Sequence, residues 1–151
     1  MDRSALYAVL DTYLAALDAR DPGKVTWAKG AETSENNVML AIGDGMWGTI
    51  DRLGDYRLRF ADARTGEVGY FGTVIEPLEE SAFTLRLKVN AEGEVCEAEA
   101  LVVRQSDSGI KFENPAYWDK PILNADAQAP VDRAEMVRLS NGYFDTLQLN
   151  D

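Results

Sequence analysis

The alternation of hydrophobic and polar positions divides the chain into a helical start, an extended middle and a helical end. Residues 3–20 carry apolar side chains at three- and four-residue spacing, which predicts an amphipathic helix that Asp21-Pro22-Gly23 ends. From Asp55 the spacing changes to two, which predicts strands over 56–62, 67–76, 81–90 and 94–104. A second amphipathic helix is predicted over about 132–149.

The stretch from residue 24 to residue 45 is less regular. Residues 33–37 predict a turn or the polar end of a short strand, and 38–42 predict a brief apolar strand. A glycine turn at 43–45 then precedes a possible single turn of helix at 46–50. One helix followed by consecutive hairpin-linked strands predicts the α+β class with an antiparallel sheet.

The hairpin formed by the last two strands has a register that separates its faces. If Arg86 lies opposite Glu97, one face carries only apolar side chains, namely Phe83, Leu85, Leu87, Cys96, Ala98, Ala100 and Val102. The other face carries Thr84, Arg86, Lys88, Glu97 and Glu99, so opposite charges lie adjacent and we interpret them as structural. The small residues on the apolar face leave room for a cavity or for a closely packed helix.

The final helix repeats the pattern of the first at an offset of 130 residues. Asp2-Arg3 aligns with Asp132-Arg133, Tyr13 with Tyr143, and Asp21 with Asp151, together with several apolar positions. Two unrelated amphipathic helices can agree in their apolar positions, but a shared Asp, Arg, Tyr and Asp favours a true repeat. We therefore predict that the helix belongs with a companion chain, a second domain, or a neighbouring copy that accepts it by swapping.

Composition removes several function classes. The 151 residues contain 15 Lys plus Arg against 26 Asp plus Glu, a net charge of −11, which disfavours nucleic acid and anionic membranes as partners. The sequence has no His and one Cys, so imidazole bases, His-ligated metals and an internal disulfide are excluded. No apolar stretch approaches the length of a membrane span and no signal-peptide pattern is present, so we expect a cytoplasmic protein.

Short motifs along the first two thirds of the chain resemble the nuclear transport factor 2-like superfamily, in particular a SnoaL-like branch of unknown function that often carries two domain copies. The resemblance rests on residues 13–17 with Asp21-Pro22, and on 35–37, 43–47, 56–62, 66–72 and 85–89. It implies a cone-shaped, cystatin-like fold in which a curved antiparallel sheet wraps the N-terminal helix around a deep apolar pocket. Many members use an Asp/His pair, which this chain lacks.

The resemblance also sets the expected domain organisation. It implies a nuclear transport factor 2-like domain over 1–104 and a helix at 132–151 that resembles the start of a second copy. Residues 105–131 between them are expected to form an irregular connector with an aromatic anchor at Tyr117-Trp118.

Four residues are candidates for acid–base chemistry, each with a structural alternative. Glu35 is the best local candidate because the resemblance converges there, although Glu35 with Asn36 also suits a solvated turn or cap. Lys29 is a candidate base that can instead extend to solvent. Tyr56 is a candidate acid if its strand faces the pocket, in which case Arg59 pairs with an acidic neighbour outside. A bulge would turn Arg59 inward to hold an oxyanion.

Aromatic residues are the predicted walls of a substrate site. The expected substrate-binding residues are Trp27, Asn36, Trp47, Phe60, Tyr70, Phe71 and Tyr13. The same rings suit a core or an interface between two domain copies, and Tyr13 on the apolar helix stripe suits a core position.

These observations lead to a functional prediction. We expect a lyase or dehydratase, needing no cofactor or metal, that acts on a hydrophobic, aromatic, hydroxylated small molecule by elimination or retro-aldol cleavage. The alternatives are an isomerase or cyclase for a polyketide or steroid-like ligand, and a non-catalytic binding or assembly module. A second copy of the domain, as a homodimer or as a companion chain or domain, is the expected protein partner.

Overall fold

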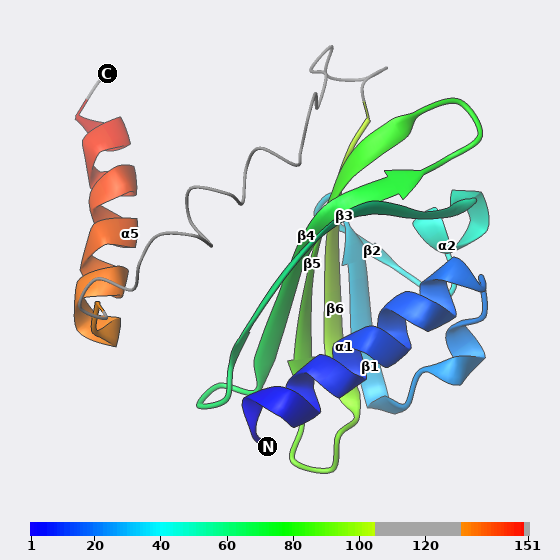
Figure 1. Ribbon diagram of the computed structural model, residues 1–151, viewed down its shortest axis with the longest axis horizontal. Coiled ribbons are helices and arrows are strands. Elements are labelled where there is room, and N and C mark those ends of the chain that lie inside the picture. The colour runs from blue at the N-terminus through cyan, green and yellow to red at the C-terminus, as the bar shows by residue number, and fades with distance from the viewer. Residues whose placement is uncertain (105–130, 150–151) are drawn as a thin grey trace. The chain divides into compact units, whose positions relative to one another are not determined.

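The computed structural model describes residues 1–104 and 131–149, and the chain divides into two units that are described separately. The first unit contains the helix α1 (Arg3–Asp18) and a six-stranded sheet, with α1 lying across one face of the sheet (Figure 1). A 3-10 turn (Pro22–Lys24) and the short helix α2 (Met46–Thr49) complete this unit. The strands are β1 (Trp27–Glu35), β2 (Val38–Leu40), β3 (Arg52–Asp62), β4 (Glu67–Ile75), β5 (Glu80–Val89) and β6 (Val95–Val103).

Helix α1 forms where the periodic pattern predicts it and uses that pattern for packing. The Asp2 side chain accepts a hydrogen bond from the Ala5 amide at 2.8 Å, which caps the first turn. The helix ends earlier than predicted because Arg20 adopts a left-handed backbone conformation, with φ of 53°. Its buried side chains are Leu6, Leu10, Tyr13, Leu14, Ala16 and Leu17. They form the core with the inward-facing residues of the sheet.

The sheet is mixed, whereas the sequence predicted antiparallel pairing throughout. Its order is β2-β1-β6-β5-β4-β3, and β1 runs parallel to β6. The pairs from β3 to β6 are antiparallel, as predicted. Strand β1 escaped prediction because it is mostly polar and because its register shifts between Trp27 and Glu32, where Gly30 has φ of +75°. The alternation that would mark a strand is therefore interrupted.

The hairpin of β5 and β6 has the predicted faces except at Cys96, and its register is two residues away from the predicted one. Cys96 was expected to be buried but is half-buried, and Val95 is fully buried instead, where the register shifts between Lys88 and Val89. Arg86 lies opposite Glu99 and Lys88 opposite Glu97. A shift of two preserves which side chains share a face, because the side-chain period is two. One residue of the shift arises in the turn, where the Asn90 side chain accepts hydrogen bonds from the Glu92 and Glu94 amides and closes a longer loop. The second arises at the irregularity between Lys88 and Val89.

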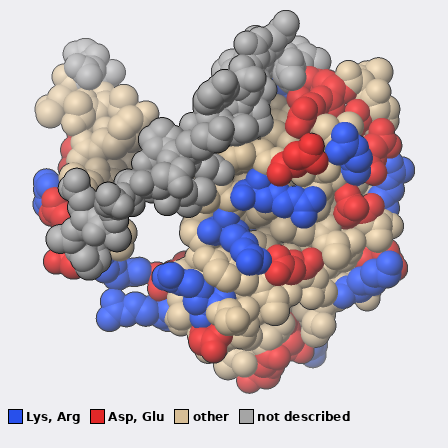
Figure 2. All heavy atoms as spheres, in the orientation of Figure 1, with Lys and Arg blue, Asp and Glu red and all other residues tan. Residues whose placement is uncertain are grey.

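Arg86 holds this outer face of the sheet together. Its guanidinium lies 3.2 Å from Glu67, 2.7 Å from Glu97 and 3.0 Å from Glu99. The structural role predicted for this cross-strand charge cluster is confirmed. Elsewhere on the first unit, acidic and basic side chains are interspersed over the face seen in Figure 2.

The second unit contains helix α5 (Arg133–Gln148), close to the predicted 132–149. The predicted connector lies almost wholly outside the described residues, including its anchor at Tyr117-Trp118. None of the helices in the described part of the chain is both long and apolar enough to cross a bilayer.

Candidate functional site

Three charged side chains meet where co-directional strands of the sheet end. Strands β1 and β6 are parallel, and β4 runs the same way because both β4 and β6 are antiparallel to β5. Glu35 is the last residue of β1, Glu76 follows β4, and Arg104 follows β6. The common strand direction places all three at one end of the sheet, beside the short helix α2.

Glu35 is held by the backbone around it. Its Oε2 accepts a hydrogen bond from the Met46 amide at 2.7 Å, at the start of α2. Its Oε1 lies 3.5 Å from the Arg104 guanidinium, and 15% of the side chain is exposed. Glu35 therefore has a fixed orientation and limited access to solvent.

Arg104 links Glu35 to a second carboxylate. It donates to Glu76 from Nε at 2.7 Å and from Nη2 at 2.9 Å, and Glu76 also accepts from the Thr49 hydroxyl at 2.6 Å. The hydrogen bonds from Arg104 are the main reason that the pKa of Glu76 is lowered, against the opposing effect of burial. The pKa of Arg104 is raised in return, chiefly by its hydrogen bonds to Glu76.

A small cavity beside Glu35 lies between α1, α2 and the sheet. Its volume is about 20 Å³, which is room for about one water molecule. The lining includes Tyr13, Glu35, Leu40, Trp47, Ala98 and Ala100. The deep pocket implied by the family resemblance is thus largely filled in this structure, because Leu6, Leu10, Tyr70 and Phe83 pack the interior with almost no exposed area.

Tyr13 supplies a neutral phenol to this cavity. Its ring packs edge-on against Trp27 at 5.9 Å and Trp47 at 5.4 Å. Burial raises the pKa of Tyr13 well above its ordinary value, the hydrogen bond with Trp47 lowers it, and the nearby Glu35 charge raises it. The phenol therefore stays protonated at every physiological pH, as a hydrogen-bond donor close to a carboxylate.

The Asn36 side chain is hydrogen-bonded to the backbone of β6 in this structure. Its Nδ2 donates to the Val102 carbonyl at 3.0 Å, and its Oδ1 accepts from the Val102 amide at 2.9 Å. Asn36 and Asn37 both have positive φ, 49° and 65°, and form the turn between β1 and β2. The amide thereby fixes the end of β1, and with it Glu35, against β6.

Asn36→Ala is expected to lower the free energy of unfolding by about 1–3 kcal/mol more than Asn37→Ala does. Both changes carry the same left-handed backbone strain, so their difference reports the two hydrogen bonds to Val102. Chemical denaturation of the two variants measures it. Equal losses would show that the amide contributes nothing beyond the turn.

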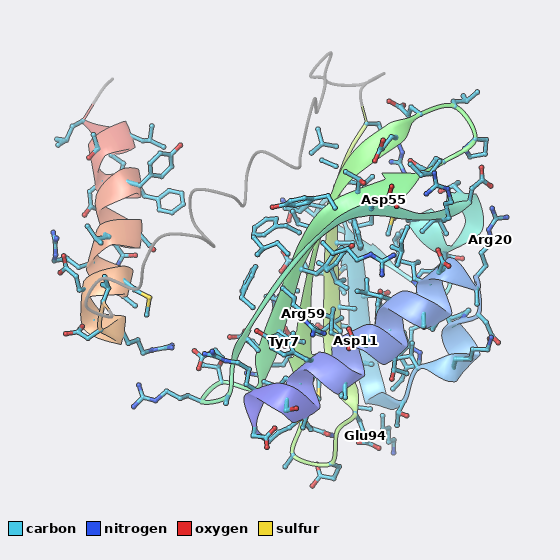
Figure 3. All side chains as sticks on the ribbon, in the orientation of Figure 1. Tyr7, Asp11, Arg20, Asp55, Arg59 and Glu94 are labelled. Atoms are coloured by element: carbon cyan, nitrogen blue, oxygen red, sulfur yellow. The ribbon has the colours of Figure 1, made fainter. Side chains whose placement is uncertain are left out.

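The other predicted catalytic residues lie away from Glu35. Lys29 is exposed on β1. Tyr56 and Arg59 belong to β3, at the opposite edge of the sheet from β2. In Figure 3, Arg59 lies beside Tyr7 and Asp11 of α1, and its guanidinium is 2.9 Å from Asp11 and 4.5 Å from the Tyr7 ring centroid. This group ties β3 to α1.

The side chains of β3 face the opposite way from the first expectation. Arg59 lies on the side that the alternative with a bulge predicted. The register of β3 shifts between Leu53 and Arg57. Arg59 lies on the side of α1, whereas Phe60 is 49% exposed and was expected to face the interior.

The predicted aromatic walls fall into three separate groups. Tyr13 and Trp47 line the cavity near Glu35, and Trp27 packs against the Tyr13 ring. Tyr70 is a core residue that packs on Phe83, with ring centroids 5.7 Å apart. Phe60 and Phe71 pair at 5.4 Å on the other face of the sheet. Only the first group shares a site with a candidate acid or base.

An open groove of about 460 Å³ lies on that outer face, lined by Phe60, Phe71 and Leu101 together with Arg86 and Glu99. This groove has the volume for a small molecule, but its arginine, Arg86, is already bound by three carboxylates. The smaller cavity beside Glu35 combines a carboxylate, a buried phenol and an indole. We therefore place the candidate site there.

Solved structures resemble this fold, while the sequence matches no protein-family model and none of the curated proteins. A protein of unknown function with a cystatin-like fold from Methylobium petroleophilum PM1 has a TM-score of 0.56 at 16% identity, covering 87% of this chain and 97% of that chain. A nuclear transport factor 2-like protein of unknown function from Cytophaga hutchinsonii ATCC 33406 has a TM-score of 0.54 at 7% identity, covering 70% and 95%. The chain has the nuclear transport factor 2-like fold. A SnoaL-like family member from Agrobacterium tumefaciens str. C58 is also similar, with a TM-score of 0.46 at 15% identity, covering 67% and 99%.

The predicted α+β class and fold family are thereby confirmed. Within the nuclear transport factor 2-like fold, sequence reasoning found Glu35 and Tyr13 but missed Glu76, Arg104 and Thr49. The available signal was the position of Glu76 and Arg104 as the last residues of the predicted strands 67–76 and 94–104. This signal identifies a shared site only when the strand directions are known. The parallel pairing of β1 with β6, which sets those directions, was not recognised from the sequence.

Gly45 keeps the cavity wall close to Glu35, and Gly45→Ala is expected to lower the free energy of unfolding by about 1–2 kcal/mol. Its φ is +64°, and an added Cβ would lie 2.5 Å from Glu35 Oε2 and 2.7 Å from Leu40 Cδ1. Gly48→Ala is the matched control, because that site is helical with nothing within 4 Å, and we expect it to be neutral or slightly stabilising. Thermal unfolding of both variants compares them, and equal melting temperatures would contradict this role of Gly45.

Proposed function

We propose that this chain is a proton-transfer enzyme of the lyase or dehydratase type, with Glu35 as general base and Tyr13 as hydrogen-bond donor. The observation that carries the proposal is that an oriented carboxylate and a buried, protonated phenol share one cavity wall. General acid–base catalysis requires positioned groups of these two kinds near the same substrate atoms.

Elimination of water is the simplest reaction that the two groups support. Glu35 accepts a proton from a carbon next to a carbonyl group, and the electron pair of that C–H bond forms the new double bond. The carbon–oxygen bond of a neighbouring hydroxyl breaks, and the hydroxide leaves as water with a returned proton. Tyr13 donates a hydrogen bond to the carbonyl oxygen while it gains negative charge. Retro-aldol cleavage uses the same groups, with the proton taken from the hydroxyl and the carbon–carbon bond broken.

The substrate proposed from the cavity lining is a hydroxylated molecule with an aromatic or other flat apolar part. Trp47 and Tyr13 line the cavity with aromatic rings, and Ala98 and Ala100 contribute small side chains to its wall. A ring needs more than the present 20 Å³. Leu40 lines the cavity, and Gly43 and Gly45 with φ of +96° and +64° follow it in the chain, so we propose that this segment moves outward on binding.

The test is turnover of a defined set of phenolic diols, hydroxysteroids and hydroxylated polyketides by the purified chain. Mass spectrometry distinguishes loss of water from carbon–carbon cleavage, and an isomer of unchanged mass would indicate the isomerase or cyclase alternative. A set that the protein leaves wholly unchanged would count against catalysis.

A non-catalytic binding or assembly module is the second candidate, and a specific observation favours it. The interior of the first unit is nearly filled, while helix α5 has no buried residue. Binding of a panel compound at the cavity without any chemical change, retained by Glu35→Gln, would support this candidate over the enzyme.

A further inference from the structure

Helix α5 reproduces the construction of α1 in detail. Each helix has 16 residues, Arg3–Asp18 and Arg133–Gln148. Each begins after an aspartate whose side chain accepts a hydrogen bond from the amide three residues later, Asp2 from Ala5 at 2.8 Å and Asp132 from Glu135 at 2.9 Å. The equal caps and lengths extend the sequence match at an offset of 130 residues.

The two helices differ in what covers the shared face. In α1, Leu6, Tyr13, Leu14 and Leu17 are buried against the concave side of the sheet. Their counterparts in α5 are Met136, Tyr143, Phe144 and Leu147, which are 51–63% exposed. Among the described residues, the same pattern is therefore buried under a sheet in α1 and exposed in α5.

An exposed helix of this composition is a poor candidate for independent stability. Sixteen residues make a helix roughly 24 Å long, and isolated helices of this length are marginal in water. Ser140, Asn141 and Gly142 in its centre are weak helix formers, and Gly alone costs about 1 kcal/mol relative to Ala. Its stability must come from burial of its apolar face.

The residues that differ between the two helices restrict which surface can cover α5. The counterparts of buried Leu10 and Ala16 are Ser140 and Thr146, whose hydroxyls donate to the Met136 carbonyl at 2.9 Å and to the Gly142 carbonyl at 2.7 Å. Both hydroxyls are satisfied inside the helix and can be buried. Phe144 is larger than its counterpart Leu14. Compared with the surface that covers α1, the surface that covers α5 must therefore have larger side chains opposite Ser140 and smaller side chains opposite Phe144.

We propose that α5 is the central helix of a second domain with the nuclear transport factor 2-like fold, and that the concave, aliphatic face of that domain's curved sheet covers it. A second copy of residues 1–104 does not provide this face, because its own α1 already occupies it. The proposal is independent of any catalytic activity of Glu35.

A helix graft in the full chain tests whether α5 is built for such a sheet. Residues 3–18 are replaced by the sequence of 133–148, alone or with the repair Ser140→Leu. We expect both grafts to unfold cooperatively, with the melting temperature of the repaired graft closer to that of the original chain. The control graft uses residues 131–146 and turns the polar face inward. If neither graft melts more cooperatively than this control, the proposal is wrong.

Hydrogen exchange of the ungrafted chain tests whether the covering sheet lies elsewhere. We expect α5 amides to exchange roughly 100-fold faster than those of α1, at low and high protein concentration alike. Protection of α5 equal to that of α1 would show that this chain covers the helix itself. Protection that rises with concentration would show that a second copy does, and either result would overturn the proposal.

Discussion

Glu35→Gln is expected to lower kcat/KM at least about 100-fold for any compound that the chain converts. Glutamine has nearly the same shape and keeps an oxygen that accepts the hydrogen bond from the Met46 amide, which is 2.7 Å from the carboxylate. What it loses is the ability to accept a proton. The loss should appear in kcat as well as in kcat/KM, because the interaction changes during the reaction.

The matched control for this variant is Glu32→Gln, which removes an exposed carboxylate from the same strand. We expect Glu32→Gln to retain full activity and both variants to keep the melting temperature of the original chain. Equal activity of Glu35→Gln and Glu32→Gln would remove Glu35 from the mechanism.

Glu76→Ala is expected to lower the free energy of unfolding by about 3 kcal/mol. Glu76 has 8% of its side chain exposed and binds Arg104, so its removal leaves a largely buried guanidinium with Glu35 at 3.5 Å. The estimate lies at the low end for buried ion pairs because a quarter of the Arg104 side chain is exposed. Urea denaturation measures the loss. The exposed turn residue Glu92, changed to Ala, is the control and should have little effect.

The same ion pair makes stability depend on pH in a defined direction. Since the hydrogen bonds from Arg104 lower the pKa of Glu76 in the folded protein, the pair stabilises the fold above the unfolded pKa of about 4.5. This contribution is lost as the pH falls through the lower folded value. Glu76→Gln should therefore weaken the acid dependence of unfolding below about pH 4.5. An unchanged acid limb would contradict the ion-pair assignment.

Much of the fold follows from local patterns in the sequence. The period of the apolar residues defines α1, α5 and the strands β3 to β6, because each of these elements carries apolar residues at a regular spacing. Strand β1 lacks this signal, since its residues are mostly polar and its register is broken at Gly30. Its parallel pairing with β6 joins segments about 65 residues apart, as in the pair Thr33 and Ala98, which no local pattern encodes.

The candidate site was predicted only where a residue carries its own signal. Glu35 was marked by the polar turn and by the family resemblance, and Tyr13 by the apolar stripe of α1. The prediction for Phe60 failed because the apolar alternation of β3 does not say which of its faces meets α1, and the strand places Phe60 on the outer face. Glu76 and Arg104 meet Glu35 only through the strand order, so their roles emerge from the tertiary structure.

The central claim is that small molecules bind beside Glu35 on the concave side of the sheet, and mapping a bound compound by methyl NMR tests it most directly. Compounds from the turnover set are titrated into protein labelled at Ala, Leu and Met methyl groups. The account predicts shifts at Ala98, Ala100, Leu40 and Met46, which surround the cavity. Shifts confined to Leu101 in the outer groove, or no shifts with any compound, would contradict it.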